Sequence, residues 1–327
     1  MKPLVKAQLN NMVNLIIQKS EFCPHNGLLN GKMGLCVFLY HYARFTNDQT
    51  ISALAEDLVN SVYDQIAKTR LHGLENGITG IAWGLHHLAV NNFVEADLDD
   101  VLHDADKIYT NNVEQSGGFL NDEWFGIGLY VLLRLKSNNI EKWMATIQIL
   151  IKHLRRQLLL SRFMDFSIKI YRSKTLASML LVFTEIYKMG ICRQEIESIF
   201  SEINQSIIFS HKEEKNMLDK KLLEQIMLET EKIISAFYIP KELNIFPIEQ
   251  MTMMELNSYY LNNLIFNKIQ ISDDLLTQKI HQIISDPHLI PHLLSLFRSD
   301  CMGLNTHITG LSWTFLQWLV THDNFKN

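Results

Sequence analysis

The sequence contains few of the residues that make tight turns, with only 14 glycines and 6 prolines among 327 residues. A sandwich or barrel of short strands needs a turn about every 8–12 residues, so this scarcity argues against that class. The glycines are also clustered, because all except Gly190 lie in residues 27–34, 73–84, 117–128 and 303–310. Composition therefore predicts long helices separated by a few glycine-rich turns.

Several other features are missing. The four cysteines lie far apart and form no Cys-x-x-Cys pair, so there is neither a disulfide framework nor a zinc-ribbon spacing, which fits a reducing compartment. Residues 1–20 lack the uninterrupted apolar segment of a signal peptide. No apolar run reaches the roughly 18 residues that a membrane span needs. These absences predict a cytoplasmic protein without a membrane span.

The charge balance gives no sign of a nucleic-acid partner, since the net charge is −5 and the isoelectric point is near 6.2. Residues 152–174 are a local exception, with seven Lys or Arg side chains against the single acid Asp165. That pattern is typical of a solvated helical face, and the functional alternative is a docking patch for an acidic partner. P-loop, GxSxG and HExxH motifs are absent.

Internal repetition is the most informative feature that is present. The segments Gly27–Leu35, Gly73–Ile81 and Gly303–Leu311 share landmark positions separated by four and then three residues, and each precedes an apolar stretch. A looser copy runs from Gly118 to Tyr130. The copies that begin at residues 27, 73 and 118 are 46 and 45 residues apart, which accommodates two helices and two loops. The chain length then corresponds to about seven such units.

The stretches that follow the glycines are apolar nearly all round, as in buried helices, whereas those between them are amphipathic. Asp97 or Asp99 is a suitable N-cap for the amphipathic helix expected over residues 97–112. Alternation of buried and amphipathic helices predicts an all-α fold, a seven-fold α/α toroid with inner and outer rings in one domain over residues 1–327. An open α-solenoid is the alternative. The helical segments expected outside the first two glycine turns are 51–68, 97–112, 140–160, 173–189, 193–208, 215–236, 251–267, 273–284 and 308–320.

The repeats resemble those of the lanthionine synthetase C-like (LanC-like) proteins. The resemblance rests on the Gly-x-x-Gly that opens a helix leading to Phe38–Asp48, on Gly77–Leu85 and on Phe119–Tyr130. It covers the glycine segments well and residues 140–300 only through helix count. The resemblance implies a seven-fold α/α toroid. It also implies zinc at the mouth of a central cavity, where a peptide cysteine is activated and added to a dehydrated Ser or Thr to close a thioether ring.

The sequence departs from that family pattern at its chemical positions. No Trp-Cys segment exists, and the place of the family's Cys-His pair is taken by Asn305 and Thr306, with His307 one step later. The family's catalytic Asp falls on Gly73, and its catalytic His falls on Asp122. By resemblance the chain is a divergent LanC-like scaffold without the cyclase site, so no cofactor is expected.

Two alternatives keep a catalytic or metal site near the glycine turns. Relocated zinc ligands could come from His307, Cys301 and Asp300, although nothing in the sequence guarantees that they converge. Asp122 and Glu123 beside Trp124 could act as an acid/base pair, as in α/α-toroid glycosidases, or could simply stabilise a helix N-terminus. Catalytic candidates are thus Asp122, Glu123 and His307. Candidates for substrate binding are Trp83, Trp124, Trp313, Asn305 and Tyr40, and core packing is the alternative for the tryptophans.

These observations predict a protein of ribosomal peptide maturation that binds a precursor peptide or partners another peptide-modifying enzyme. A genuine cyclase with relocated zinc ligands and a carbohydrate hydrolase are the alternatives.

Overall fold

In this computed structural model the described residues are 2–69, 71–111, 121–135, 140–161, 182–183, 185–199, 273–285, 290–291 and 307–323. They form helices and the connections between helices, without any strand in these ranges. The all-α prediction is therefore confirmed. Within the same ranges every helix is too short or too polar to cross a membrane. The chain divides into two compact units, residues 1–102 with 238–327, and residues 103–237. A single domain and a seven-fold ring stay predictions.

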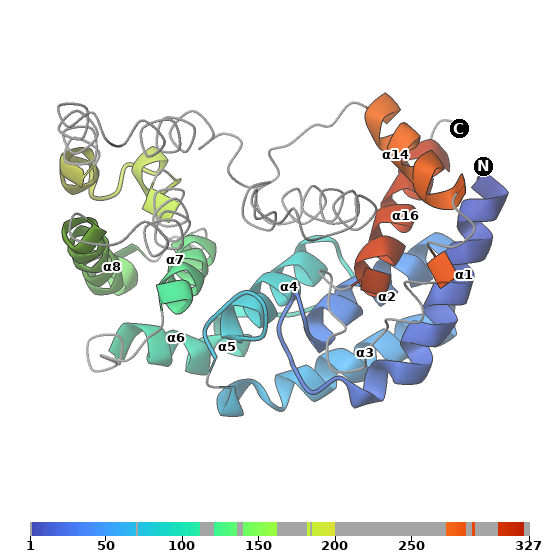
Figure 1. The fold of residues 1–327 in the computed structure, drawn as a ribbon. Helices are drawn as coiled ribbons and strands as arrows, with labels where there is room; N and C mark the ends of the chain where they lie inside the picture. Colours follow the sequence, from blue (N-terminus) through green and yellow to red (C-terminus); the bar gives the residue numbers. More distant parts are fainter. Residues whose placement is uncertain are drawn as a thin grey trace, which may run out of the picture. The chain divides into compact units, whose positions relative to one another are not determined.

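The first unit repeats one helical pattern (Figure 1). Helix α1, the 3-10 helix η1 and helix α2 are followed by helix α3, the 3-10 helix η2 and helix α4 in the same order, with first residues 46 or 47 positions further along the chain. The repeat inferred from the glycines is thus a structural repeat over these residues. Its elements are α1 (Lys2–Lys19), η1 (Ser20–Phe22), α2 (Lys32–Thr46), α3 (Gln49–Tyr63), η2 (Ile66–Lys68), α4 (Ile78–Val90) and α5 (Leu98–Val101), with α14 (Asp273–Ser285) and α16 (His307–Asp323) added from the C-terminal part.

Burial alternates between these helices as the sequence predicts. Helix α2 is buried continuously from Met33 to Tyr40, and α4 is buried from Ile78 to Leu85. Helix α3 buries only one stripe, made of Ala55, Leu58, Val59 and Val62. A helix buried on all faces needs neighbours on all sides, whereas one with a single apolar stripe covers them from outside.

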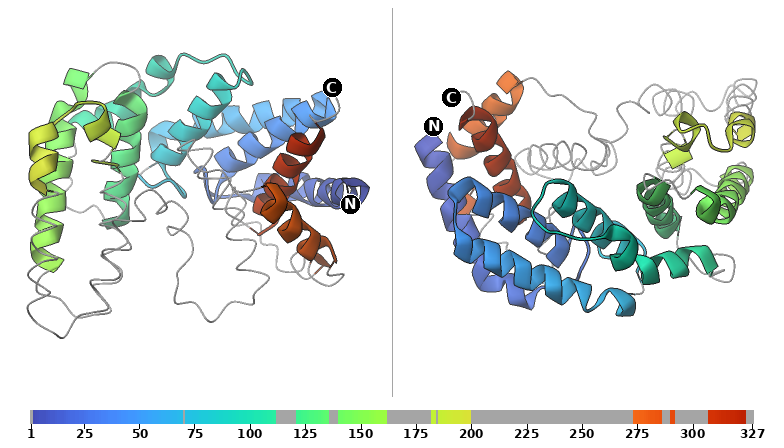
Figure 2. Two further views of the ribbon diagram at one scale, coloured as in Figure 1. Left: turned by 90° about the horizontal axis from the view of Figure 1, so that it is seen from above. Right: turned by 180° about the vertical axis from the view of Figure 1, so that it is seen from behind.

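The two ends of the chain meet in this unit. Helices α4 and α16 both pack against α2, so the last glycine-segment helix lies beside the first (Figure 2). Helix α1 packs on α16, and the Lys2 ammonium donates to the carbonyl of His322 at 2.6 Å. The N-terminal helix thus takes the place beside α16 that α3 takes beside α2. A closed ring requires this adjacency of first and last repeats, whereas an open solenoid keeps its ends apart.

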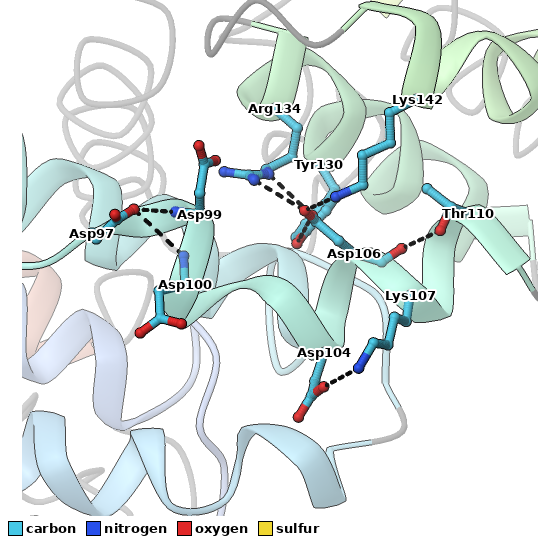
Figure 3. A network of polar contacts seen from close by, with 10 residues as sticks. All are labelled: Asp97, Asp99, Asp100, Asp104, Asp106, Lys107, Thr110, Tyr130, Arg134 and Lys142. Atoms are coloured by element: carbon cyan, nitrogen blue, oxygen red, sulfur yellow. Dashed lines mark hydrogen bonds and ion pairs between the residues drawn. The ribbon is translucent and has the colours of Figure 1, made fainter.

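The second unit contains α6 (His103–Asn111), α7 (Asn121–Leu135) and α8 (Ile140–Ser161). From Gly126 to Leu135 helix α7 is fully buried, and it packs against α8, which also contacts α6. A carboxylate ties the three helices together (Figure 3). Asp106 of α6 accepts hydrogen bonds from Tyr130 and Arg134 of α7, and it pairs with Lys142 of α8 at 2.6 Å.

Local polar groups set several helix boundaries. Helix α3 begins two residues before the predicted start because Asp48 accepts hydrogen bonds from the amides of Thr50 and Ile51. Asp97 caps α5 as predicted, but the expected single helix over 97–112 is divided at Leu102 into α5 and α6. Helices α8, α14 and α16 match their predicted spans within a few residues. Residues 182–183, 185–188 and 193–199 are helical as expected, whereas the helices predicted over 215–236 and 251–267 lie outside the described residues.

Candidate functional site

The first two glycine turns share one backbone conformation. Gly31 and Gly77 both precede their helices in an extended conformation, with φ of −131° and −112°. The two turns also make the same backbone hydrogen bond. The Lys32 amide donates to the His25 carbonyl and the Ile78 amide donates to the Leu71 carbonyl, each seven residues earlier in the chain and each at 2.9 Å. The repeat therefore reproduces the extended glycine and this hydrogen bond at the start of each buried helix.

The two turns are also hydrogen-bonded to each other. The Leu28 amide donates to the Leu74 carbonyl at 3.2 Å, and the Asn30 amide donates to the Glu75 carbonyl at 3.1 Å. A Cβ atom at Gly27 would collide with the backbone of Glu75 and Asn76, and one at Gly80 would collide with the backbone of Leu74 and Leu28. The glycines at these positions are required because two backbones meet there.

Gly73 is different, although it is the repeat equivalent of Gly27. A Cβ atom there would meet only one close atom, Oε2 of the flexible Glu75 side chain at 2.9 Å. The position to which the resemblance assigns a catalytic Asp is thus not closed by packing. It is a half-buried stretch of backbone with a carboxylate beside it.

The aromatic candidates are buried. Trp83 is 5% exposed and Trp313 is 3% exposed, and Tyr40 lies 5.5 Å from Phe93 between ring centroids. Burial, with a smaller effect of Glu56, raises the pKa of Tyr40 to about 12. Trp124 is 9% exposed and stacks on His153 at 4.1 Å. These environments suit the core-packing alternative, and a role in substrate binding stays a prediction.

The remaining candidates are described only in part. Asp122 and Glu123 belong to the first turn of α7, and His307 is the first residue of α16, but their side chains lie outside the described part of the chain. Asp300, Cys301 and Asn305 also lie outside it. Where side chains are described, no three His, Cys, Asp or Glu residues gather in a way that could hold a metal ion.

A histidine pair that sequence reasoning missed joins two buried helices. Nε2 of His41 on α2 and Nε2 of His87 on α4 lie 2.8 Å apart, so one ring donates to the other. Burial is the main cause that lowers the pKa of His41 to about 3 and that of His87 to about 4, and Arg44 lowers both further. Both rings are therefore neutral at pH 7. The signal was present, because 46 residues, one repeat, separate them.

Aromatic groups surround this pair. The ring of Trp313 meets the His41 ring edge-on at 5.0 Å, and Phe93 lies 4.7 Å from the same ring. Arg44 stacks on Phe93, with Cζ 3.4 Å from the ring centroid. The helices α16, α2 and α4 thus contribute Trp313, His41 and His87 to one cluster.

Comparison with known proteins gives one match. A family model described as "Lanthionine synthetase C-like protein" matches residues 25–225, which is more than half of the chain. The matched range begins before the first glycine turn and includes the second turn and the looser third copy. No curated protein and no solved structure matches.

Proposed function

Because the chain belongs to the lanthionine synthetase C-like family, we propose that it serves the maturation of a ribosomally made peptide. In this proposal it binds the precursor peptide, or a second peptide-modifying enzyme, and does not itself close thioether rings. The family is one of peptide modification.

One contrast carries the proposal, namely a preserved backbone with substituted chemical groups. The interlocked turns around Gly27 and Gly80 keep the scaffold. Zinc in proteins is held by thiolate, imidazole and carboxylate groups. The positions that the resemblance assigns to a Cys-His pair instead carry the amide of Asn305 and the hydroxyl of Thr306. This donor set does not fit the ion, and we expect the protein to function without a metal cofactor.

The open backbone at Gly73 is where we expect the peptide to approach. Backbone or bulky side-chain atoms crowd the Cβ positions of Gly27, Gly31, Gly77, Gly80 and Gly84. At Gly73, by contrast, the nearest atom is Oε2 of the Glu75 side chain at 2.9 Å, and the next is the Glu75 amide nitrogen at 3.9 Å. The Glu75 carboxylate can accept hydrogen bonds from peptide N–H groups or pair with a peptide cation. The same absence of bulk at Gly73 lets another chain come close.

The test of peptide binding begins with a search of the neighbouring genes for a precursor peptide and its modifying enzymes, which are then used as ligands. We expect the purified protein to bind the labelled peptide saturably in fluorescence anisotropy, or to co-purify with one of those enzymes. We also expect less than one tenth of an equivalent of zinc by mass spectrometry, and no thioether formation on the dehydrated peptide. Stoichiometric zinc together with ring closure would instead establish a cyclase with relocated ligands.

The location is tested by filling the space over Gly73. Gly73→Val adds bulk where only the Glu75 side chain must move, so we expect at least tenfold weaker peptide binding with an unfolding free energy within about 1 kcal/mol of wild type. The control is Asn47→Gly, a change at the exposed C-terminal end of α2 that removes a positive φ of 57°. Equal affinity of Gly73→Val and wild type would place the peptide elsewhere.

A further inference from the structure

Arg44 is held rigidly at the end of helix α2. Its Nη2 donates to the carbonyl of Asn91 at 2.8 Å and to that of Asn92 at 3.2 Å. The left-handed turn at Asn92, with φ of 54°, directs the chain back so that Phe93 lies under the guanidinium at 3.4 Å. Two hydrogen bonds and a stacking contact therefore fix the guanidinium plane before any ligand arrives.

Some N–H donors of this fixed guanidinium make no hydrogen bond within the described part of the chain. Arg44 is exposed, and the two hydrogen bonds to carbonyls use Nη2 alone, which leaves the donors on Nη1 and Nε without a partner among the described residues. None of the ion pairs in the described part of the chain includes Arg44. Preorganised guanidinium donors without a carboxylate partner match the geometry of an incoming oxyanion.

The two histidine rings near Arg44 are not acted on by a carboxylate. The groups that act on the His41 and His87 rings are the rings themselves, His86 and Arg44, and no carboxylate is among them. The hydrogen-bonded histidines and Phe93 form a half-buried apolar wall that lowers the local dielectric constant. A carboxylate that binds Arg44 beside this wall gains more than it would at a fully solvated arginine.

We propose that Arg44, fixed by Phe93 and by the carbonyls of Asn91 and Asn92, binds a carboxylate of the peptide ligand. This inference rests on the proposed function, since it assigns an acidic residue or the C-terminus of the bound peptide to this arginine. A single carboxylate is the appropriate ligand because the chain carries a net charge of −5, which disfavours long polyanions. Arg44 has no equivalent in the second repeat, where Val90 stands 46 residues later, so the repeat itself does not require it.

The test uses the full chain with ¹⁵N-labelled arginine and two small probes, N-acetylglutamate α-amide, which has one carboxylate, and N-acetylglutamine α-amide, which has none. We expect the Arg44 Nε–H resonance, assigned with Arg44→Lys, to shift saturably with the first probe, with a Kd on the order of 1–10 mM. The internal control is Arg193, an exposed arginine that also lies over an aromatic ring, that of Tyr187, at 5.5 Å. Equal shifts of both arginines, or equal shifts with both probes, overturn the proposal.

Two further arms sharpen the outcome. A second titration uses inorganic phosphate. If phosphate saturates the Arg44 shift at a concentration ten times lower than the glutamate probe does, the ligand group is a phosphate, and the assignment of a carboxylate ligand is overturned. With the precursor peptide, Arg44→Gln should weaken binding at least fivefold, whereas Arg44→Lys should weaken it less. If Arg44→Gln binds the peptide as wild type does, the carboxylate site is wrong and peptide binding stands. If the wild-type chain does not bind the peptide, the proposed function fails, while the probe titration still decides the site.

Discussion

Removal of the Asp106 charge should destabilise the second unit strongly. The Asp106 carboxylate is 1% exposed, and the Arg134 side chain that binds both its oxygens is 6% exposed. Lys142, at 34% exposure, and the Tyr130 hydroxyl complete its contacts (Figure 3). Asp106→Asn keeps the size of the side chain but leaves the buried guanidinium without a counter-charge, and its amide N–H₂ group faces donors instead of accepting from them.

The size of the destabilisation by Asp106→Asn follows from the burial of the ion pair. Breaking one partner of a buried ion pair costs about 3–5 kcal/mol, because the remaining charge is desolvated without compensation. Lys142 adds less to this cost, since its side chain is 34% exposed. The same helix offers a matched control, because Asp104 pairs with Lys107 where both side chains are mostly exposed, at 65% and 57%. Asp104→Asn should therefore change the free energy of unfolding by no more than about 0.5 kcal/mol.

The assay is urea unfolding followed by circular dichroism, with amide hydrogen exchange on peptides from α6, α7 and α8 to localise the effect. We expect faster exchange in all three helices of Asp106→Asn, since the carboxylate joins them, and wild-type exchange in Asp104→Asn. Salt at 0.5 M should leave the difference largely intact because a buried pair is poorly screened. A cost below about 1 kcal/mol for Asp106→Asn would show that desolvation cancels the ion-pair attraction, and the reasoning would be refuted.

Three further outcomes follow from the first unit. Gly27→Ala should lower the free energy of unfolding in urea by about 2–5 kcal/mol, since two backbones must separate. The repeat-equivalent Gly73→Ala should change it by no more than about 1 kcal/mol. Equal losses in the two variants would contradict the interlocked turns. Ser312→Ala should raise the melting temperature, because the buried Ser312 hydroxyl has no partner among the described residues, whereas Thr79→Val should lower it by removing a 2.7 Å bond to the His72 carbonyl. The folded pKa values of His41 and His87, about 3 and about 4, lie below the ordinary 6.5, so the unfolded chain takes up protons first as the pH falls. Stability should be constant above about pH 6.5 and fall towards pH 4 by up to about 1.4 kcal/mol per pH unit and histidine, and His41→Gln should flatten that slope in equilibrium unfolding.

The sequence predicts those parts of the fold that repeat. Spacing between glycines locates the turns before α2 and α4, and apolar patterning separates the buried helices from α3, because both signals are local or recur at a fixed interval. The division at Leu102 and the Asp106 network were not predictable in this way. Both depend on which residues from distant helices meet, and a single carboxylate in an amphipathic helix has the pattern of a solvent-facing residue.

Residues of the site were predictable only where equivalent positions of the repeats carry recognisable side chains. His41 and His87 stand at equivalent positions, and comparison of the repeats beyond the glycines would have paired them. The tryptophans were found by the same register, but spacing alone does not tell a ring that lines a cavity from one that fills a core. Arg44 gave no signal, because its rigidity comes from Phe93 and a left-handed turn at Asn92 that sequence patterns do not place.

The glycines of the two described turns separate scaffold from function. At Gly27 and Gly80 a neighbouring backbone excludes any side chain, so a chain that keeps this fold must keep these glycines whatever chemistry it performs. Their presence is therefore evidence for the fold and says nothing about activity. Gly73 has no such constraint, because only the Glu75 side chain stands over it and its φ lies outside the left-handed region. Folding would accept many residues there. Under the proposed function a peptide uses the space over Gly73, so substitutions at Gly73 test function separately from folding.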